Sequence, residues 1–222
     1  MAKAIGVQFR SGIKIYDFKQ KGDDIQIRDQ VLVDTSYGEE IGTVRYVNKE
    51  VKEAKETPLK DITKLLSEKD VDRLERLKNE HIGYVDIFKK NIEQHSLDMK
   101  FVEFEFSLDG EKVTFYFTAD SRVDFRNLVR EMSRQIKKTV LLRQMGQRDE
   151  ARVLDGFGPC GRPICCRNFL TKLENISMDM VREQYEGSRN ASKVSGACGK
   201  LMCCLAFEKG KEKTVTKKES VK

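Results

Sequence analysis

Six cysteines are the residues of this sequence best suited to chemistry, and they are gathered in its last third. All of them lie between positions 160 and 204 of a chain of 222 residues. In a reducing compartment, such clustering is typical of metal binding or redox work rather than of structural disulfides. Soft thiolate ligands select zinc, copper(I) or iron–sulfur clusters. The six candidates are Cys160, Cys165, Cys166, Cys198, Cys203 and Cys204.

The cysteines belong to two copies of one motif. Residues 158–166 read GPCGRPICC and residues 196–204 read GACGKLMCC, which are identical at five of nine positions. Two thiolates from each copy would supply the four ligands that a zinc ion or a cubane (4Fe-4S) cluster requires. The glycine after the first cysteine permits a tight turn, and we expect Arg162 and Lys200 to offset the charge of the thiolates. The first choice of ligands is Cys160, Cys165, Cys198 and Cys203.

Cys166 and Cys204 are additional to these four ligands. They are expected either to face a second cluster, completed by a partner chain, or to be buried cysteines that act as small apolar residues. Spacing alone supports zinc and an iron–sulfur cluster equally, because C-x4-C lies at the edge of zinc-knuckle spacing. A thiol-redox enzyme is disfavoured by the absence of C-x-x-C, and no motif gives positive evidence for catalysis.

The N-terminal half predicts a small β module and then a long helix. Alternating apolar residues and turn signals predict strands at 3–9, 12–18, 30–34 and 41–47. Residues 49–61 are highly charged and are interpreted as a solvated connector. A helix is predicted over 67–95, with a capping box formed by Ser67 and Asp70. His81 falls on its apolar stripe and is expected to be half-buried, whereas His95 is expected at the helix end, where the dipole favours a cation.

The following residues predict a hairpin, a helix and two further strands. The hairpin comprises residues 101–106 and 113–117 around Asp109-Gly110. A second capping box at Ser121 opens a helix to about residue 137, and strands are predicted at 139–143 and 151–154. The fold class is therefore α+β: a small β module, then an α/β sandwich with a mainly antiparallel sheet, then an irregular Cys-rich segment. The predicted domains are residues 1–50, 60–155, 156–207 and a disordered basic tail at 208–222, with a helix at 179–185.

Charge and hydropathy favour a cytoplasmic protein without a membrane span. The net charge is +6, but residues 209–222 contribute six lysines and two glutamates, so the body is nearly neutral. The charge allows RNA binding without demonstrating it. No run of 18 apolar residues and no signal-like segment is present. The alternative function is a zinc-stapled module that contacts RNA through Arg143, Arg148, Arg152, Arg162 and Arg167.

Several motifs resemble the polymerase-suppressor C-terminal-domain (PSP-one) family and, within it, the YaaT (RicT) branch. They are residues 141–152 (LLRQMGQRDEAR), 156–161 (GFGPCG), 175–180 (NISMDM) and the two cysteine motifs. The resemblance implies a non-enzymatic iron–sulfur regulatory subunit that forms a complex with the helical proteins YlbF and YmcA. It further implies a role in messenger RNA maturation by RNase Y and in sporulation, competence and biofilm formation. Cys160, Cys165, Cys198 and Cys203 match the family's cluster ligands, and Cys166 matches an extra cysteine available for a shared cluster.

Overall fold

The computed structural model of the chain describes residues 2–9, 14–19, 24–35, 38–51, 59–170, 173–184 and 191–208. The chain divides into two compact units, which span residues 1–145 and 146–222. The α+β fold class is confirmed, because the first unit holds two sheets and three helices and the second holds short helices and loops. The finer division into four segments stays a prediction. Among the described residues, no helix is both long and apolar enough to cross a bilayer.

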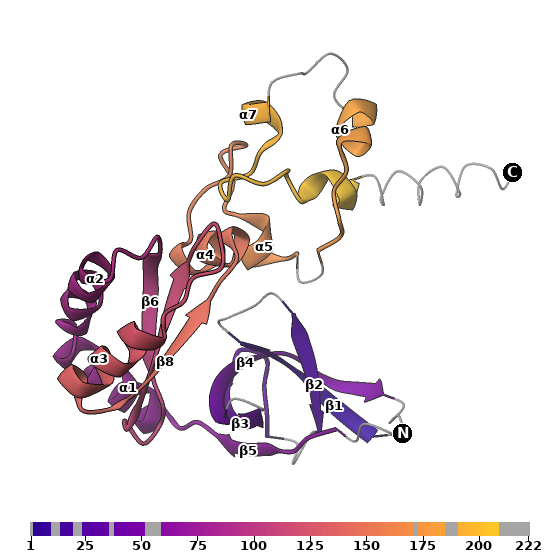
Figure 1. Cartoon of the computed structure of the whole chain (residues 1–222). Coiled ribbons are helices and arrows are strands. Elements are labelled where there is room, and N and C mark those ends of the chain that lie inside the picture. Colours follow the sequence, from indigo (N-terminus) through magenta and orange to yellow (C-terminus); the bar gives the residue numbers. More distant parts are fainter. Residues whose placement is uncertain are drawn as a thin grey trace, which may run out of the picture. The chain divides into compact units, whose positions relative to one another are not determined.

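The first sheet is antiparallel and has the strand order β2-β1-β4-β3-β5 (Figure 1). Inward-pointing apolar residues from several strands form its core, among them Val7, Val33 and Val44, all with 0% exposure. This arrangement confirms the predicted β module. Its strands are β1 (Ala2–Phe9), β2 (Ile15–Lys19), β3 (Gln30–Thr35), β4 (Gly38–Val51) and β5 (Ile62–Leu65).

Two parts of this sheet differ from the prediction. β4 continues to Val51, where Lys3 pairs with Glu50, so the start of the predicted connector belongs to the sheet. Residues 52–58 of that connector lie outside the described residues. β5 was not predicted, because only Ile62 of its four residues is buried and it has no alternating apolar pattern.

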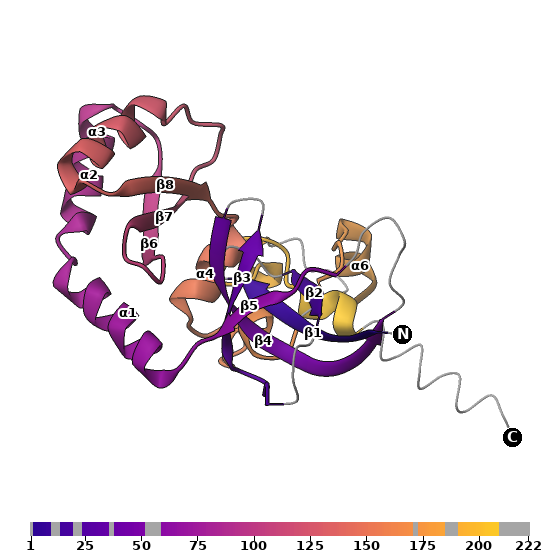
Figure 2. The same ribbon diagram turned by 90° about the horizontal axis from the view of Figure 1, so that it is seen from below.

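The second sheet is covered on one face by three helices, as Figures 1 and 2 show. Its order is β6-β7-β8, with β6 antiparallel and β8 parallel to β7. The predicted hairpin is confirmed, and the parallel pairing arises because a helix carries the chain from β7 to β8. Aromatic rings fill the core: Phe88 stacks on Phe115 with their centroids 5.0 Å apart. The elements are α1 (Glu68–Glu80), α2 (Tyr84–Gln94), β6 (Lys100–Phe106), β7 (Lys112–Thr118), α3 (Arg126–Ile136) and β8 (Thr139–Gln144).

The single helix predicted over residues 67–95 is wrong, because the chain turns between α1 and α2. His81 ends α1, and Gly83, which has no Cβ, precedes α2. The His81 prediction is confirmed: its half-buried ring packs edge-on against Tyr84 and Phe106. His95 lies exposed at the end of α2, as predicted.

Two other local predictions are wrong. α3 begins at Arg126, five residues beyond the predicted cap at Ser121. Asp124 instead accepts a hydrogen bond from the backbone N–H of Arg126 at 3.2 Å, which satisfies a donor at the start of the helix. Residues 151–154, predicted as a strand, form the end of helix α4 (Gln147–Leu154). The charged side chains between the apolar residues of this segment fit a helix with one buried face.

The second unit has a small core of its own. Val181, Val194 and Leu205 are nearly fully buried and pack together. Its other helices are α5 (Cys165–Asn168), α6 (Met178–Gln184) and α7 (Ala191–Val194), and residues 204–208 are also helical. α6 confirms the helix predicted at 179–185, of which Tyr185 lies outside the described residues, as does the tail from residue 209.

Replacing Asp70 with asparagine is expected to destabilise the first unit in a pH-dependent way. The Asp70 carboxylate pairs with Lys64 at 2.7 Å and accepts the backbone N–H of Ser67 at 3.0 Å. Lys64 first, and then Ser67, lower the pKa of Asp70 from 3.8 to about 2. Because the folded-state pKa is depressed, this contribution is fully present above the unfolded pKa and is lost as the pH falls through about 2.

Urea unfolding of the wild type and the Asp70→Asn variant at several pH values measures this effect. The two midpoints should differ at neutral pH and converge as the pH falls from about 4 to about 2. Asp72→Asn, at an exposed position on the same helix, is the matched control. A gap between the midpoints that did not change with pH would contradict the expectation.

Candidate cysteine-ligated metal centre

The first copy of the cysteine motif folds as a tight hairpin loop. The backbone N–H of Gly158 donates to the carbonyl of Arg162 at 2.8 Å, and the N–H of Gly161 donates to the carbonyl of Gly158 at 2.9 Å. Gly161 has φ +74°, in the left-handed region that disfavours residues with a Cβ. Cys160 lies between these glycines, and its Sγ is 3.5 Å from the position that a Cβ on Gly158 would occupy. A turn followed by a left-handed residue directs N–H groups inward, an arrangement found at many iron–sulfur sites.

The second copy repeats this geometry. The N–H of Gly196 donates to the carbonyl of Lys200 at 2.8 Å, and that of Gly199 donates to the carbonyl of Gly196 at 2.9 Å. Gly199 has φ +73°, and the Sγ of Cys198 is 3.8 Å from a Cβ position on Gly196. A β-bridge closes each loop at equivalent positions, Phe157 with Pro163 and Ser195 with Leu201. The duplication in the sequence is therefore a duplication in the structure.

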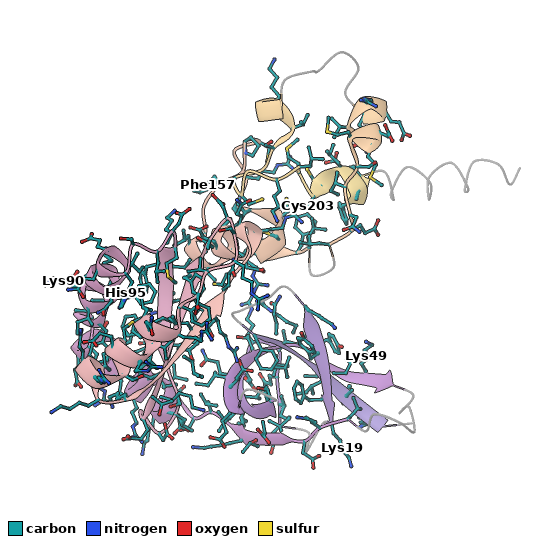
Figure 3. The ribbon with its side chains drawn as sticks, viewed as in Figure 1. Lys19, Lys49, Lys90, His95, Phe157 and Cys203 are labelled. Atoms are coloured by element: carbon teal, nitrogen blue, oxygen red, sulfur yellow. The ribbon has the colours of Figure 1, made fainter. Side chains whose placement is uncertain are left out.

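The six predicted site residues are brought together around one cavity of about 60 Å³. All six are free thiols, five half-buried and Cys160 exposed. Figure 3 labels Cys203 in the second copy and Phe157 beside the first. Within the described residues, no three His, Cys, Asp or Glu side chains converge closely enough to hold a single metal ion. The thiols therefore surround a space and do not meet at a point.

The two copies contact each other in a reciprocal way. The equivalent rings of Phe169 and Phe207 pack edge-on with their centroids 5.2 Å apart. Reciprocal contacts are the signature of a two-fold arrangement, here between two halves of one chain. Two electrostatic interactions among the thiols are also equivalent between the copies: Cys165 with Cys204, and Cys166 with Cys203.

Three of the six cysteines have thiol pKa values raised by their surroundings: Cys166, Cys203 and Cys204. Burial, followed by the neighbouring Cys203 and Cys198, raises the pKa of Cys166. Burial also raises the pKa of Cys203, and it raises that of Cys204 to about 11. A metal or cluster that binds these sulfurs as thiolates must therefore displace protons.

Two arginines of α4 lower the pKa values of the thiols. The sequence did not predict this role for them. Arg148 lines the cavity and its charge lowers the pKa of Cys203, opposing the effect of burial. Arg152, which is 7% exposed, acts in the same way on Cys166. The two arginines are four residues apart, so a helical interpretation of residues 147–154 would have placed them on one face. Arg162 and Lys200, the expected counter-charges, are both exposed.

Four of the five arginines of the alternative RNA-binding hypothesis are buried or contact other groups of the protein, and one of these four, Arg167, is nevertheless exposed. Arg152 is buried, and Arg148 donates to a backbone carbonyl at 3.2 Å. Arg143 and Arg167 each form an ion pair with a carboxylate of their own unit. The fifth arginine, Arg162, is exposed and forms no ion pair among the described residues.

Replacing Gly161 or Gly199 with alanine should destabilise the second unit by similar amounts. Nothing lies within 4 Å of a Cβ at either position, so the cost is that of the left-handed backbone, about 1–2 kcal/mol. Thermal unfolding of the reduced protein measures it.

Gly83→Ala is the control for these two variants. Gly83 has φ −61° and equally open surroundings, so alanine there should instead stabilise by about 0.4–1 kcal/mol. A harmless substitution at Gly161 or Gly199 would show that the loop conformation is not required for stability.

The chain matches known proteins over both of its units. Residues 60–145 match the family described as the PSP1 C-terminal conserved region, and residues 175–218 match the third domain of PSP1-like proteins. Stage 0 sporulation protein YaaT of Bacillus subtilis (strain 168) is 42% identical over 215 residues, which cover 96% of this chain and 78% of that protein. No solved structure matches the chain. These matches confirm the resemblance inferred from the motifs, and the chain belongs to the PSP1 family, in its YaaT branch.

Proposed function

We propose that this protein is a non-enzymatic regulatory subunit that binds an iron–sulfur cluster through its two cysteine loops. The observation that carries the proposal is the placement of all six thiols around one cavity. Thiolates are the ligands by which clusters are held in proteins. Cys160, Cys165, Cys198 and Cys203 are the proposed ligands of the first cluster, and Cys166 is available to a second.

A cluster of several atoms fits the arrangement better than a single zinc ion does. Structural zinc requires four ligands within about 2.3 Å of one point. The described residues offer no such convergence, although all six cysteines line one cavity. Six thiols also exceed what a closed zinc site uses. These observations favour an iron–sulfur cofactor, with zinc as the alternative.

The regulatory part of the proposal rests on the relative. Its name identifies it as a stage 0 sporulation protein, and we extend a role in sporulation to this chain. By family resemblance, the protein would act in the cytoplasm with YlbF- and YmcA-like proteins and promote RNase Y-dependent maturation of messenger RNA. Competence and biofilm formation would depend on the same complex.

The surface of the second unit supports docking of a partner. Four large apolar side chains there are more than half exposed, including Phe157 at 70% and Leu154 at 60%. The other two are Phe169 and Met178. Phe157 adjoins the first cysteine loop, so a partner that covered it would also lie near the cofactor (Figure 3).

Anaerobic purification of the chain alone tests the cofactor. Visible absorbance and the contents of iron, acid-labile sulfide and zinc are measured on one sample, before and after reconstitution with iron and sulfide. A brown protein with matched iron and sulfide supports the proposal. A colourless protein that holds stoichiometric zinc and takes up no iron or sulfide on reconstitution would refute the proposal and support the zinc-stapled module.

A further inference from the structure

Arg148 lines the cavity and has a buried hydrogen-bond donor for which the described residues provide no acceptor. Its side chain lines the cavity from α4, and its Nη2 donates to the carbonyl of Leu201 in the second loop at 3.2 Å. Its Nε is buried, and no group in the described part of the chain accepts a hydrogen bond from it. Native proteins seldom leave a buried donor without an acceptor.

The neighbouring carboxylate does not fill this role. Asp149 interacts electrostatically with Arg148, but its own buried Oδ1 also lacks a hydrogen bond. Cys203 lines the same cavity as Arg148, and the guanidinium charge lowers the pKa of its thiol. An acceptor bound in the cavity that Arg148 lines would satisfy this donor.

We propose that Arg148 is a positioning residue of the cofactor site, whose Nε–H donates to a sulfur of the bound cluster while Nη2 holds the second loop through Leu201. This inference rests on the proposed iron–sulfur function. Only a guanidinium can do both, because its planar fork presents several donors at fixed angles and stays charged. Hydrogen bonds and positive charge at the sulfurs make a cluster easier to reduce.

The test is the reduction equilibrium of the reconstituted chain, followed by anaerobic redox titration with visible and electron paramagnetic resonance spectra. Arg148→Gln removes the charge and should lower the equilibrium constant for reduction about tenfold, which is about 59 mV for a one-electron couple. Arg148→Lys keeps the charge but lacks the planar guanidinium, so its equilibrium constant for reduction should lie between those of the wild type and Arg148→Gln. Arg182→Gln, an exposed arginine on α6 that does not line the cavity, is the control and should behave as the wild type.

The outcomes separate this inference from the function on which it rests. A purely structural arginine would lower the amount of cluster bound and leave the potential of the remaining cluster unchanged, which would overturn the inference alone. If Arg148→Gln retains no cluster, Arg148→Lys decides: a lower potential supports the inference, and a wild-type potential refutes it. A wild-type chain that binds no iron and sulfide would overturn both the inference and the proposed function.

Discussion

Serine in place of Cys203 is expected to remove the cofactor, whereas serine in place of Cys204, the adjacent residue, should leave it bound. Cys203 is one of the four proposed ligands and Cys204 is not. Loss of an outer-shell partner of a metal ligand already lowers affinity by about 10–100-fold, and loss of a ligand should exceed this. Iron and sulfide contents after anaerobic reconstitution, normalised to protein, measure the difference.

The structure adds a symmetry condition to this prediction. Because Cys165 is the equivalent of Cys203 in the other copy, Cys165→Ser should lose the cofactor to the same extent. The proposed complex supplies a second measurement, since co-purification with YlbF- and YmcA-like proteins should fail together with cluster binding. Full cluster content in the Cys203→Ser variant would refute the ligand assignment, and an intact complex without a cluster would separate docking from the cofactor.

Removing the charge of Arg143 is expected to destabilise the first unit by about 1–3 kcal/mol, because it leaves a half-buried carboxylate without its counter-ion. Arg143 on β8 pairs with Glu40 on β4, and their side chains are 17% and 15% exposed. Glu40 also accepts a hydrogen bond from Thr35 at 2.5 Å. The pair joins the N-terminal sheet to the sheet of the α+β core, so Arg143→Met should weaken both together.

Chemical unfolding followed by circular dichroism measures this loss, and two further variants isolate its cause. Glu40→Gln combined with Arg143→Met removes both charges and should recover part of the stability. Arg134→Met removes an exposed charge on α3, where the side chain is 72% exposed, and should change the stability by less than about 0.5 kcal/mol. Equal effects of Arg134→Met and Arg143→Met would show that the half-buried pair contributes no more than a surface charge.

The sequence was sufficient for the parts of the fold that have strong local patterns. The hairpin 101–118 alternates strictly, and Ser67 with Asp70 forms both hydrogen bonds of a capping box. The turn at residues 81–83 escaped prediction because Leu77, His81, Val85 and Phe88 keep helical spacing across it. The backbone leaves the helical conformation at His81, and the ring of this residue packs against Phe106.

The candidate site was predictable in composition and less so in arrangement. The repeated motif identified all six thiols, and the glycines at 161 and 199 have the left-handed conformation that their positions after a cysteine indicated. The expectation that Arg162 and Lys200 offset the thiolate charge stays a prediction: both residues are exposed, and Arg162 lines the cavity. Arg148 and Arg152 lie outside the motif and reach the thiols through a helix that was taken for a strand.

The reciprocal packing of the two loops also affects how the cavity assembles. Both halves belong to one chain, so their encounter is intramolecular, and a short linkage of this kind supplies an effective concentration of about millimolar. The number of thiols that line the cavity is therefore independent of the protein concentration. A cavity divided between two separate subunits would lose half of its sulfur donors on dilution, whereas this one keeps all six.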